Sequence, residues 1–322
     1  MSNFTFKKAV REEVGLIIGI AGESGSGKTF SALRLATGMA RGKPFCVIDT
    51  EAGRAKHYAS AFNFDHGDLR APFRPDSYAE AIDAADKAGY PVIVVDSTSH
   101  VWAGDGGVLD WQEEELDRMA GDDWKKREAC KMAAWIKPKM SHKRMVQKLL
   151  QVRAHLILCF RSEPKVEIIR EDGKTKIVPK QSITGLDGWL PICEKNLPYE
   201  LTASFLMHAS APGVPRPIKL QEQHRALVPL DKPITEETGK ALAAWAAGGV
   251  AKPAADKPAA TAAKTDTSPI RDTLMRQLHD SAVAGTEPLR EAWGGLSKAE
   301  QKIIGEAGLR DLQALARQGA AS

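Results

Sequence analysis

The segment that most constrains the fold of this chain is the glycine-rich run from Gly22 to Thr29, GESGSGKT. An apolar run over residues 14–20 precedes it, and residues 30–39 carry apolar side chains at helical spacing. Glycines let successive backbone N–H groups turn inward, while the lysine and the threonine add a positive charge and a hydroxyl. This succession of strand, loop and helix predicts a phosphate-binding loop in an α/β fold.

We expect the loop to hold the phosphates of ATP together with Mg²⁺. Lys28 would contact the β- and γ-phosphate oxygens, and the hydroxyl of Thr29 would bind the metal ion. The positive end of the following helix favours the same anion. The expected nucleotide contacts are Gly22, Glu23, Ser24, Gly25, Ser26, Gly27, Lys28, Thr29 and Phe30.

Composition sets the broad class of protein. The chain has 322 residues, of which 43% are hydrophobic, so it can form a large core. Its net charge of +4 is too small to identify a polyanionic partner. The first residues lack the apolar stretch of a signal peptide and no apolar run could span a membrane, which predicts a cytoplasmic protein. Four dispersed cysteines favour packing over zinc or redox chemistry.

Apolar strands alternate with helices along the first half of the chain, which predicts a mainly parallel sheet flanked by helices. The predicted strands cover residues 14–20, 44–49, 92–95 and 154–160. Ligands of such sheets bind at the carboxyl ends of the strands. The charged residues at or just past these ends are Lys28, Glu51, Asp96 and Arg161. We therefore expect these side chains to form the catalytic site.

Two acidic residues receive specific roles. Asp96 follows aliphatic residues at a strand end, where a carboxylate can hold Mg²⁺ or its water, so Thr29 and Asp96 form the predicted metal site. Glu51 follows the second strand and is the candidate base for the attacking water, although a solvated loop glutamate is the other interpretation. Asp49 competes for this role, or could orient Thr29 or a metal-bound water.

Arg161, with Lys165, could sense or neutralise the γ-phosphate from the end of the fourth strand. A surface ion pair with Glu163 or Glu167 is an equally good interpretation. The sequence does not separate these two alternatives.

After the fourth strand the pattern changes. Residues 166–170 and 175–178 flank an Asp-Gly turn signal, which predicts a hairpin. Residues 201–207 and 218–220 predict further antiparallel strands that extend the sheet, and residues 235–247 predict a closing helix.

The composition predicts a three-part organisation. Residues 1–247 form the phosphate-loop domain, and the Ala- and Pro-rich residues 248–269 form a flexible linker. Residues 270–322 regain helical periodicity, with Leu274 and Leu278 one turn apart, and predict a small helical domain. At about fifty residues, this domain needs a partner or the main domain for stability.

The most uneven charge lies between the third and fourth predicted strands. Its basic residues are Lys125, Lys126, Arg127, Lys131, Lys137, Lys139, Lys143, Arg144, Lys148 and Arg153, against Glu128 alone. With Trp124 and Trp135 interleaved, they match the needs of single-stranded nucleic acid, namely charge neutralisation and a stacking surface. A solvated helix face with buried tryptophans is the alternative. The preceding residues 111–117 are acidic, so the basic surface is not uniform.

The phosphate loop, residues 47–51 (VIDTE) and residues 92–97 (VIVVDS) together resemble the RecA-like ATPase core. In that family a glutamate after the second strand activates water, and Glu51 occupies the matching position. The Asp-Ser pair after the third strand matches Asp96 and Ser97. The resemblance implies a RecA-like, P-loop NTPase fold.

Residues 14–230 resemble more closely the phage-encoded AAA-family nucleotide-binding proteins, some of which are Sak4-like annealing or recombination proteins. The shared features are a basic helical segment with Trp135, a strand ending in Arg161, a charged hairpin and the Tyr199-Glu200 step. Relatives usually place a lysine nearer the arginine than Lys165 is here. The tail after residue 250 lies outside the resemblance.

The resemblance implies an ATPase that acts on single-stranded DNA in phage or prophage recombination or replication. RecA-like ATPases commonly complete their site with a basic residue of a neighbouring subunit, which predicts a homo-oligomer and makes Arg54, Lys195 and Lys219 candidates for that residue. One alternative is a non-catalytic, ATP-dependent DNA-binding or annealing module. Another is a small-molecule kinase, although the sequence contains no evident lid or acceptor-binding motif.

Overall fold

The computed structural model describes four stretches of the chain, residues 14–171, 174–179, 188–248 and 268–319. The chain divides into two compact units, Met1–Gly249 and Val250–Ser322. Three sequence predictions fall wholly or mostly outside the described residues: the absence of a signal peptide, the Asp-Gly turn of the hairpin, and the linker.

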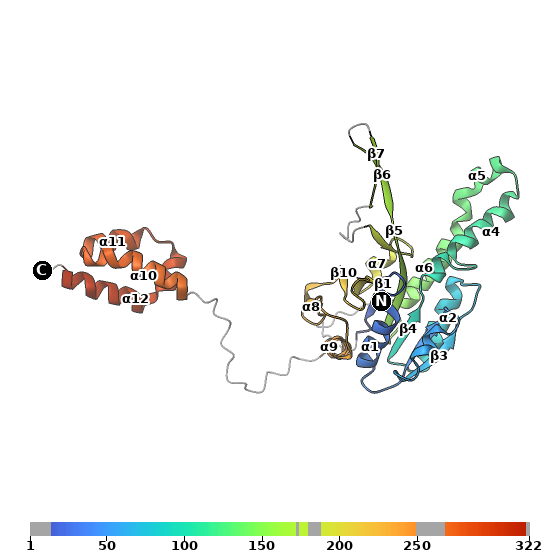
Figure 1. Cartoon of the computed structure of the whole chain (residues 1–322), viewed down its shortest axis with the longest axis horizontal. Helices are drawn as coiled ribbons and strands as arrows, with labels where there is room; N and C mark the ends of the chain where they lie inside the picture. Colours follow the sequence, from blue (N-terminus) through green and yellow to red (C-terminus); the bar gives the residue numbers. More distant parts are fainter. Residues whose placement is uncertain (1–13, 172–173, 180–187, 249–267, 320–322) are drawn as a thin grey trace, which may run out of the picture. The chain divides into compact units, whose positions relative to one another are not determined.

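The first unit is built on one large sheet (Figure 1). Its strands are β1 (Ile17–Gly22), β2 (Phe45–Asp49), β3 (Phe64–Asp68), β4 (Val92–Asp96), β5 (His155–Pro164), β8 (Trp189–Pro191), β9 (Ala203–Met207) and β10 (Arg216–Lys219). They follow the order β10-β9-β1-β5-β4-β2-β3, and β8 pairs with β5. All pairs are parallel except β9 with β10 and β5 with β8. The predicted α/β fold with an antiparallel extension is confirmed.

Three strands differ from their predictions. β9 was expected to be antiparallel but pairs in parallel with β1, so β10 supplies the antiparallel edge. β5 does not end at Arg161 but continues to Pro164, because β8 pairs with its last residues. β3 was missed, since its polar FDHGD sequence lacks the apolar run typical of a buried strand. It lies at the sheet edge, where polar side chains reach solvent.

Two helices cover one face of the sheet, α1 (Lys28–Ala40) and α9 (Glu236–Ala246). Their axes approach closely at Gly239, where a Cβ atom would collide with the carbonyl oxygen of Leu35. Arg34 and Glu236 join the two helices through an ion pair of 2.7 Å. This packing fixes α1, and with it the end of the phosphate loop.

The other face is covered by α2 (Pro75–Lys87) and α6 (Ile136–Leu149). Their buried side chains include Tyr78, Ile82, Met145 and Leu149. Short elements complete the unit: η1 (Arg54–Tyr58), α3 (His100–Ala103), α7 (Leu197–Glu200) and α8 (Glu222–Arg225).

Two segments project from the sheet (Figure 1). One is the helix pair α4 (Val108–Ala120) and α5 (Trp124–Ala134), which follows β4 in the chain. The other is the hairpin of β6 (Val166–Glu171) and β7 (Lys174–Pro179), which follows β5 and forms its own sheet. Because β4 and β5 are parallel neighbours, both projections leave from the carboxyl edge, which carries the phosphate loop.

The second unit consists of α10 (Ser268–Val283), α11 (Thr286–Gly294) and α12 (Lys298–Gly319). The last of these is interrupted at Gly305, whose φ of 71° is left-handed. The core of the second unit contains Leu274, Leu278, Ala282, Leu289, Ile304, Leu312 and Ala316. The helices expected at the C-terminus are therefore present, and they share a small apolar core.

Candidate active site

The loop between β1 and α1 has the backbone geometry of a phosphate cradle. Gly25 and Gly27 adopt φ angles of 80° and 81°, which glycine reaches without steric cost. A Cβ atom at Gly22 would collide with the hydroxyl of Ser26 and the carbonyl oxygen of Met207. These glycines are therefore required by the turn itself, and the cradle fits an anionic ligand at the start of α1.

Side chains of the loop brace it from within. The Lys28 ammonium and the Ser26 hydroxyl each donate a hydrogen bond of 2.8 Å to the carbonyl oxygen of Glu23. Ser26 is fully buried, so its hydroxyl shapes the loop instead of facing a ligand. The Glu23 carboxylate accepts a hydrogen bond of 2.8 Å from the backbone N–H of Ala209, which ties the loop to the segment after β9.

The predicted metal-binding pair is in contact. The hydroxyl of Thr29 donates a hydrogen bond of 2.5 Å to the carboxylate of Asp96 at the end of β4. Burial raises the pKa of Asp96 to about 6, an effect that the carboxylates of Glu51 and Asp49 reinforce while the Thr29 hydrogen bond and the Lys28 charge oppose it. A hydroxyl beside a carboxylate is a donor set that suits Mg²⁺, and these two residues would hold it.

Glu51 lies just past β2, and two arginines contact it. Its carboxylate accepts hydrogen bonds of 2.9 Å from Arg54 and 2.9 Å from Arg161. Burial of this side chain, which is 13% exposed, works to raise its pKa. The hydrogen bonds and charges of Arg161 and Arg54 outweigh burial, so the pKa lies below its ordinary value. Glu51 is therefore ionised at neutral pH.

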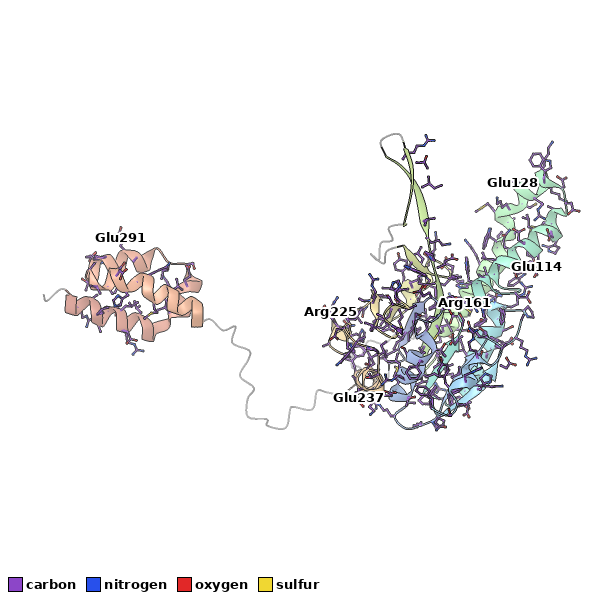
Figure 2. The ribbon with its side chains drawn as sticks, viewed as in Figure 1. Glu114, Glu128, Arg161, Arg225, Glu237 and Glu291 are labelled. Carbon is purple, nitrogen blue, oxygen red and sulfur yellow. The ribbon has the colours of Figure 1, made fainter. Side chains whose placement is uncertain are left out.

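Arg161 lies within β5 at the register position opposite Gly22 of the phosphate loop. Its side chain, labelled in Figure 2, is half exposed. It reaches Glu51 across the carboxyl edge of the sheet. Lys165 instead forms an ion pair of 2.5 Å with Glu163. Glu163, one of the two acids considered as a surface partner of Arg161, therefore pairs with Lys165. Arg161 faces the phosphate loop.

These groups line one cavity of about 550 Å³ at the carboxyl edge of the sheet. The predicted residues in its wall are Gly22, Glu23, Ser24, Gly25, Gly27, Lys28, Thr29, Phe30, Glu51, Asp96 and Arg161. The volume lies in the range typical of small-molecule sites, about 300–1,000 Å³. Residues far apart in sequence therefore converge on a single nucleotide-sized cavity.

The cavity wall contains four further residues that the sequence did not place there: Arg54, Tyr58, Ser162 and Ile192. Arg54 was expected only as a residue donated to a neighbouring subunit. The ring of Tyr58 lies 6.0 Å from that of Phe30, and the two offer an aromatic surface beside the loop. The buried hydroxyl of Ser162 has no hydrogen-bond partner among the described residues. Tyr58 could have been found from its place in the turn after Glu51, whereas Ile192 depends on β8, for which the sequence gives no signal.

The alternative role for Asp49 does not match its geometry. Its carboxylate is 1% exposed and accepts hydrogen bonds from the backbone N–H groups of Glu51 and Ala55, at 2.6 and 2.8 Å. The acid that contacts Thr29 is Asp96. Asp49 therefore shapes the turn that carries Glu51 and stays outside the cavity wall.

The candidates for a residue donated to a neighbouring subunit differ in their surroundings. Arg54 contacts Glu51 of its own chain, and the Lys219 ammonium donates a hydrogen bond of 2.6 Å to the carbonyl oxygen of Tyr199. Lys195 is exposed.

The basic segment between β4 and β5 forms α5 and α6, and about half of its cations are paired. The pairs are Arg127 with Glu113 and Asp117, Lys131 with Glu128, Lys137 with Glu115, Arg144 with Asp76, and Arg153 with Asp86. Lys125 and Lys139 lie near the rings of Trp124 and Trp135. Lys126 and Lys143 are exposed and form no ion pair with another described residue. The available positive charge is therefore smaller than the sequence suggests.

The two tryptophans of this segment have opposite environments. Trp124 is 69% exposed at the start of α5, whereas the ring of Trp135 stacks at 6.2 Å on that of Trp102. Trp135 is only partly buried, so neither tryptophan has the buried environment that the alternative interpretation required.

Neither clustered metal ligands nor a membrane-spanning helix is found in the described part of the chain. It contains no cluster of three or more His, Cys, Asp or Glu side chains that could hold a metal ion. Cys46 and Cys159 are buried and unpaired. No described helix has the length and apolar character needed to span a membrane.

Comparison with protein families gives one match. The model of the AAA domain family matches residues 15–187, which include the phosphate loop, Glu51, Asp96, the α4–α5 projection and Arg161. A search of curated proteins finds no match. The match spans more than half of the chain and coincides with the elements that form the cavity, so the chain belongs to the AAA domain family of P-loop nucleotide-binding proteins.

Proposed function

We propose that this protein hydrolyses ATP in the cavity between the phosphate loop and Glu51. The observation that carries the proposal is the contact between Thr29 and Asp96 at 2.5 Å, with an ionised glutamate in the same cavity wall. The AAA family membership supports nucleotide binding. A phosphate cradle, a metal-binding pair and a general base together meet the needs of phosphoryl transfer to water.

The residues of the cavity wall divide the work of binding, proton transfer and charge stabilisation. The loop N–H groups and Lys28 would hold the β- and γ-phosphates. Thr29 and Asp96 would hold Mg²⁺, which would supply positive charge to neutralise the phosphates. Glu51 accepts a proton from the water whose oxygen attacks the γ-phosphorus. The bond from that phosphorus to the β–γ bridging oxygen then breaks, which releases ADP and phosphate. The γ-phosphate competes with Glu51 for Arg161, so Arg161 stabilises charge on the phosphoryl group as it transfers.

The test is Mg²⁺-dependent ATP hydrolysis by the full chain, with Lys28→Ala as the inactive variant. We expect this change to reduce hydrolysis by at least about a hundredfold, because it removes the positive charge beside the phosphates. Lys43→Ala is the matched control, since Lys43 is an exposed lysine outside the cavity. Equal hydrolysis by the wild type and Lys28→Ala would contradict the proposal.

We also propose that single-stranded DNA binds the outer surface of α5 and α6. Trp124 and Lys125 begin α5, and Lys126 is exposed beside them without an ion pair to a described residue. Met132 on α5 is 80% exposed, and Ile136 and Met140 on α6 are 56% and 55% exposed. Ile136 and Met140 are four residues apart, which places them on one face of α6. Lys139 and Lys143 accompany them. Unpaired cations beside exposed apolar and aromatic side chains suit phosphates and bases respectively.

Fluorescence anisotropy with a labelled oligothymidine tests this surface over a series of salt concentrations. Lys125→Ala/Lys126→Ala should weaken binding and reduce the slope of log K against log salt by about 1.4, or about 0.7 for each phosphate that is no longer neutralised. The matched control is Lys131→Ala/Lys137→Ala, which removes the same charge from cations paired with Glu128 and Glu115. Equal effects of the two double variants would contradict the proposed surface.

In this proposal, ATP binding and hydrolysis control an oligomer on DNA during phage or prophage recombination or replication in the cytoplasm. The C-terminal helices recruit another replication or recombination protein. Size-exclusion chromatography with light scattering, with and without ATP, tests the oligomer. A monomer under every nucleotide condition would remove this part of the proposal.

One observation favours a second candidate, a non-catalytic module in which ATP is a structural ligand. Both oxygens of the Glu51 carboxylate already accept hydrogen bonds, from Arg54 and Arg161. If this arrangement persists with ATP bound, the two arginines keep the pKa of Glu51 low and weaken it as a proton acceptor. ATP-dependent DNA binding that is unchanged in Glu51→Gln, without hydrolysis by the wild type, would support this alternative.

A further inference from the structure

The turn that carries Glu51 has an unfavourable backbone. Ala52 and Gly53 have φ angles of 58° and 85°, both in the left-handed region. Glycine adopts such angles freely, but alanine does so only where the surrounding structure holds it there. A turn of this kind needs a partner that fixes both of its ends.

Asp49 supplies that partner. One of its carboxylate oxygens accepts the backbone N–H of Glu51 at 2.6 Å, and the other accepts that of Ala55 at 2.8 Å. The two hydrogen bonds tie the start of the turn to its end. Because the carboxylate is 1% exposed and outside the cavity wall, its contacts lie within the protein.

A histidine of the edge strand braces this carboxylate. The Nε2 atom of His66 on β3 lies 3.2 Å from the Oδ2 atom of Asp49 on β2. β2 and β3 are parallel neighbours whose register places His66 opposite Val47. Strand β3 thus has a role that its polar sequence did not reveal, because its histidine reaches the acid behind Glu51.

The opposite side of the turn is also fixed. The backbone N–H of Thr50 donates a hydrogen bond of 2.8 Å to the carbonyl oxygen of Asp96, and the Thr50 hydroxyl accepts one of 2.8 Å from the N–H of Ser97. The main chain before Glu51 is therefore anchored to the end of β4, where the metal-binding carboxylate lies. Beyond this anchor, the Asp49 carboxylate fixes the backbone conformation of the turn from Glu51 to Ala55.

We propose that Asp49, braced by His66, is a positioning residue that holds Glu51 at the reaction end of the cavity. Asp49 lies outside the cavity wall and acts through the backbone of the turn. This inference rests on the proposed ATPase function, in which Glu51 is the base. It assigns a role to an acid that the sequence offered as a competing base or as a group that orients Thr29 or a metal-bound water.

The first test compares Asp49→Asn with Glu51→Gln and with the double variant. Asparagine has the same size but loses one acceptor, so the turn loses one of its two ties. We expect kcat to fall about tenfold to a hundredfold, the effect of a displaced catalytic group, with KM for ATP changed less than about threefold. In the Glu51→Gln background the same change should have almost no further effect, because the two residues act as one unit.

A merely structural role would give a different pattern. Asp49→Asn would then raise KM along with any loss of kcat, and would multiply the defect of Glu51→Gln. A raised KM, a further loss of activity in the Glu51→Gln background, or an unchanged kcat would each overturn the inference. If Glu51→Gln hydrolyses ATP as fast as the wild type, the base assignment fails as well, so the two failures are distinguishable.

The second test does not depend on hydrolysis. Hydrogen exchange of the full chain should become at least about tenfold faster in Asp49→Asn at the amide of Glu51 or of Ala55, whichever loses its oxygen acceptor. The amides of β4 should remain protected. Unchanged exchange in the turn would overturn the inference whatever the activity.

A milder variant guards against misfolding of Asp49→Asn. His66→Ala removes the brace and leaves the carboxylate, and should lower kcat about fivefold, as expected when a positioning network loses one hydrogen bond. His57→Ala is the matched control, because His57 is exposed on η1 near the same turn. Equal kcat values for the two histidine variants would contradict the role of His66.

Discussion

Two regions of the molecule are rich in charged residues: the carboxyl edge of the sheet, next to the phosphate loop, and the α4–α5 projection. Their charges are arranged differently. At the sheet edge, Lys28, Glu51, Asp96 and Arg161 come from separate strands and line one cavity. In the projection, many cations meet acids of α4 or of their own helix, as Arg127 does with Glu113 and Asp117. Charges at strand ends converge because the sheet fixes their positions, whereas a charge count along helices says nothing about neutralising partners.

After Lys28 and Glu51, the largest expected effect tests the proposed metal-binding pair. Thr29→Val removes the hydroxyl that contacts Asp96 and should reduce Mg²⁺-dependent hydrolysis about a hundredfold. Thr37→Val is the control, because the Thr37 hydroxyl lies on the same helix and donates to the carbonyl oxygen of Leu33. Steady-state phosphate release measures both. Similar rates for the two variants would remove Thr29 from the site.

The next effect concerns stability. The pKa of Asp96 is raised from 3.8 to about 6. The native state therefore binds this proton more tightly than the unfolded state, and stability falls as pH rises from about 4 to 6. The ionised form costs about 3 kcal/mol at pH 7.

Asp96→Asn should therefore raise the free energy of unfolding at pH 7 by about 1–3 kcal/mol without ligand, although it impairs hydrolysis. This gain should vanish towards pH 4. Urea unfolding at several pH values measures it, and Asp122→Asn, an exposed acid between α4 and α5, is the control. A gain that is independent of pH would contradict the buried charge.

In the projection, Trp124 provides the sharper test. Trp124→Ala should weaken binding of single-stranded DNA by about 1–3 kcal/mol, the range for removing one base stack, and leave thermal stability unchanged. Tyr199→Ala is a matched control, because both rings are 69% exposed. Anisotropy and thermal melting report the two effects. Unaltered DNA affinity would move the stacking surface elsewhere.

The smallest effect is expected at Arg127. Arg127→Ala removes the pairs with Glu113 and Asp117, so amides of α5 should exchange faster with little change in the melting temperature. Hydrogen exchange measures this local loosening. Weaker DNA binding than in Lys126→Ala would show that paired cations contribute as much as unpaired ones.

The sequence was most informative where backbone and chemistry coincide. The loop GESGSGKT allows few conformations, and strands of a parallel sheet bring their ends together, so the cavity could be predicted from short segments. The contact of Thr29 with Asp96, which joins residues far apart in sequence, followed from the same rule.

The remainder depended on partners that no local pattern reveals. Arg161 looked like a strand end because its apolar run stops there, yet β5 continues while it pairs with β8. β9 looked like part of an antiparallel extension, and it does pair antiparallel with β10, but its other neighbour is β1, to which it is parallel. The role of Asp49 depends on hydrogen bonds to the backbone of a strained turn and on a histidine of an unpredicted strand. Such groups are found only from geometry.

The central claim, that Glu51 is the base for ATP hydrolysis, is tested most directly by Glu51→Gln in a paired measurement. ATP affinity and single-turnover hydrolysis should be measured on the same preparations. We predict unchanged affinity, because the phosphate loop is intact, and hydrolysis slower by about a hundredfold to ten-thousandfold, because the proton acceptor is removed. Hydrolysis at the wild-type rate with normal ATP binding would contradict the account.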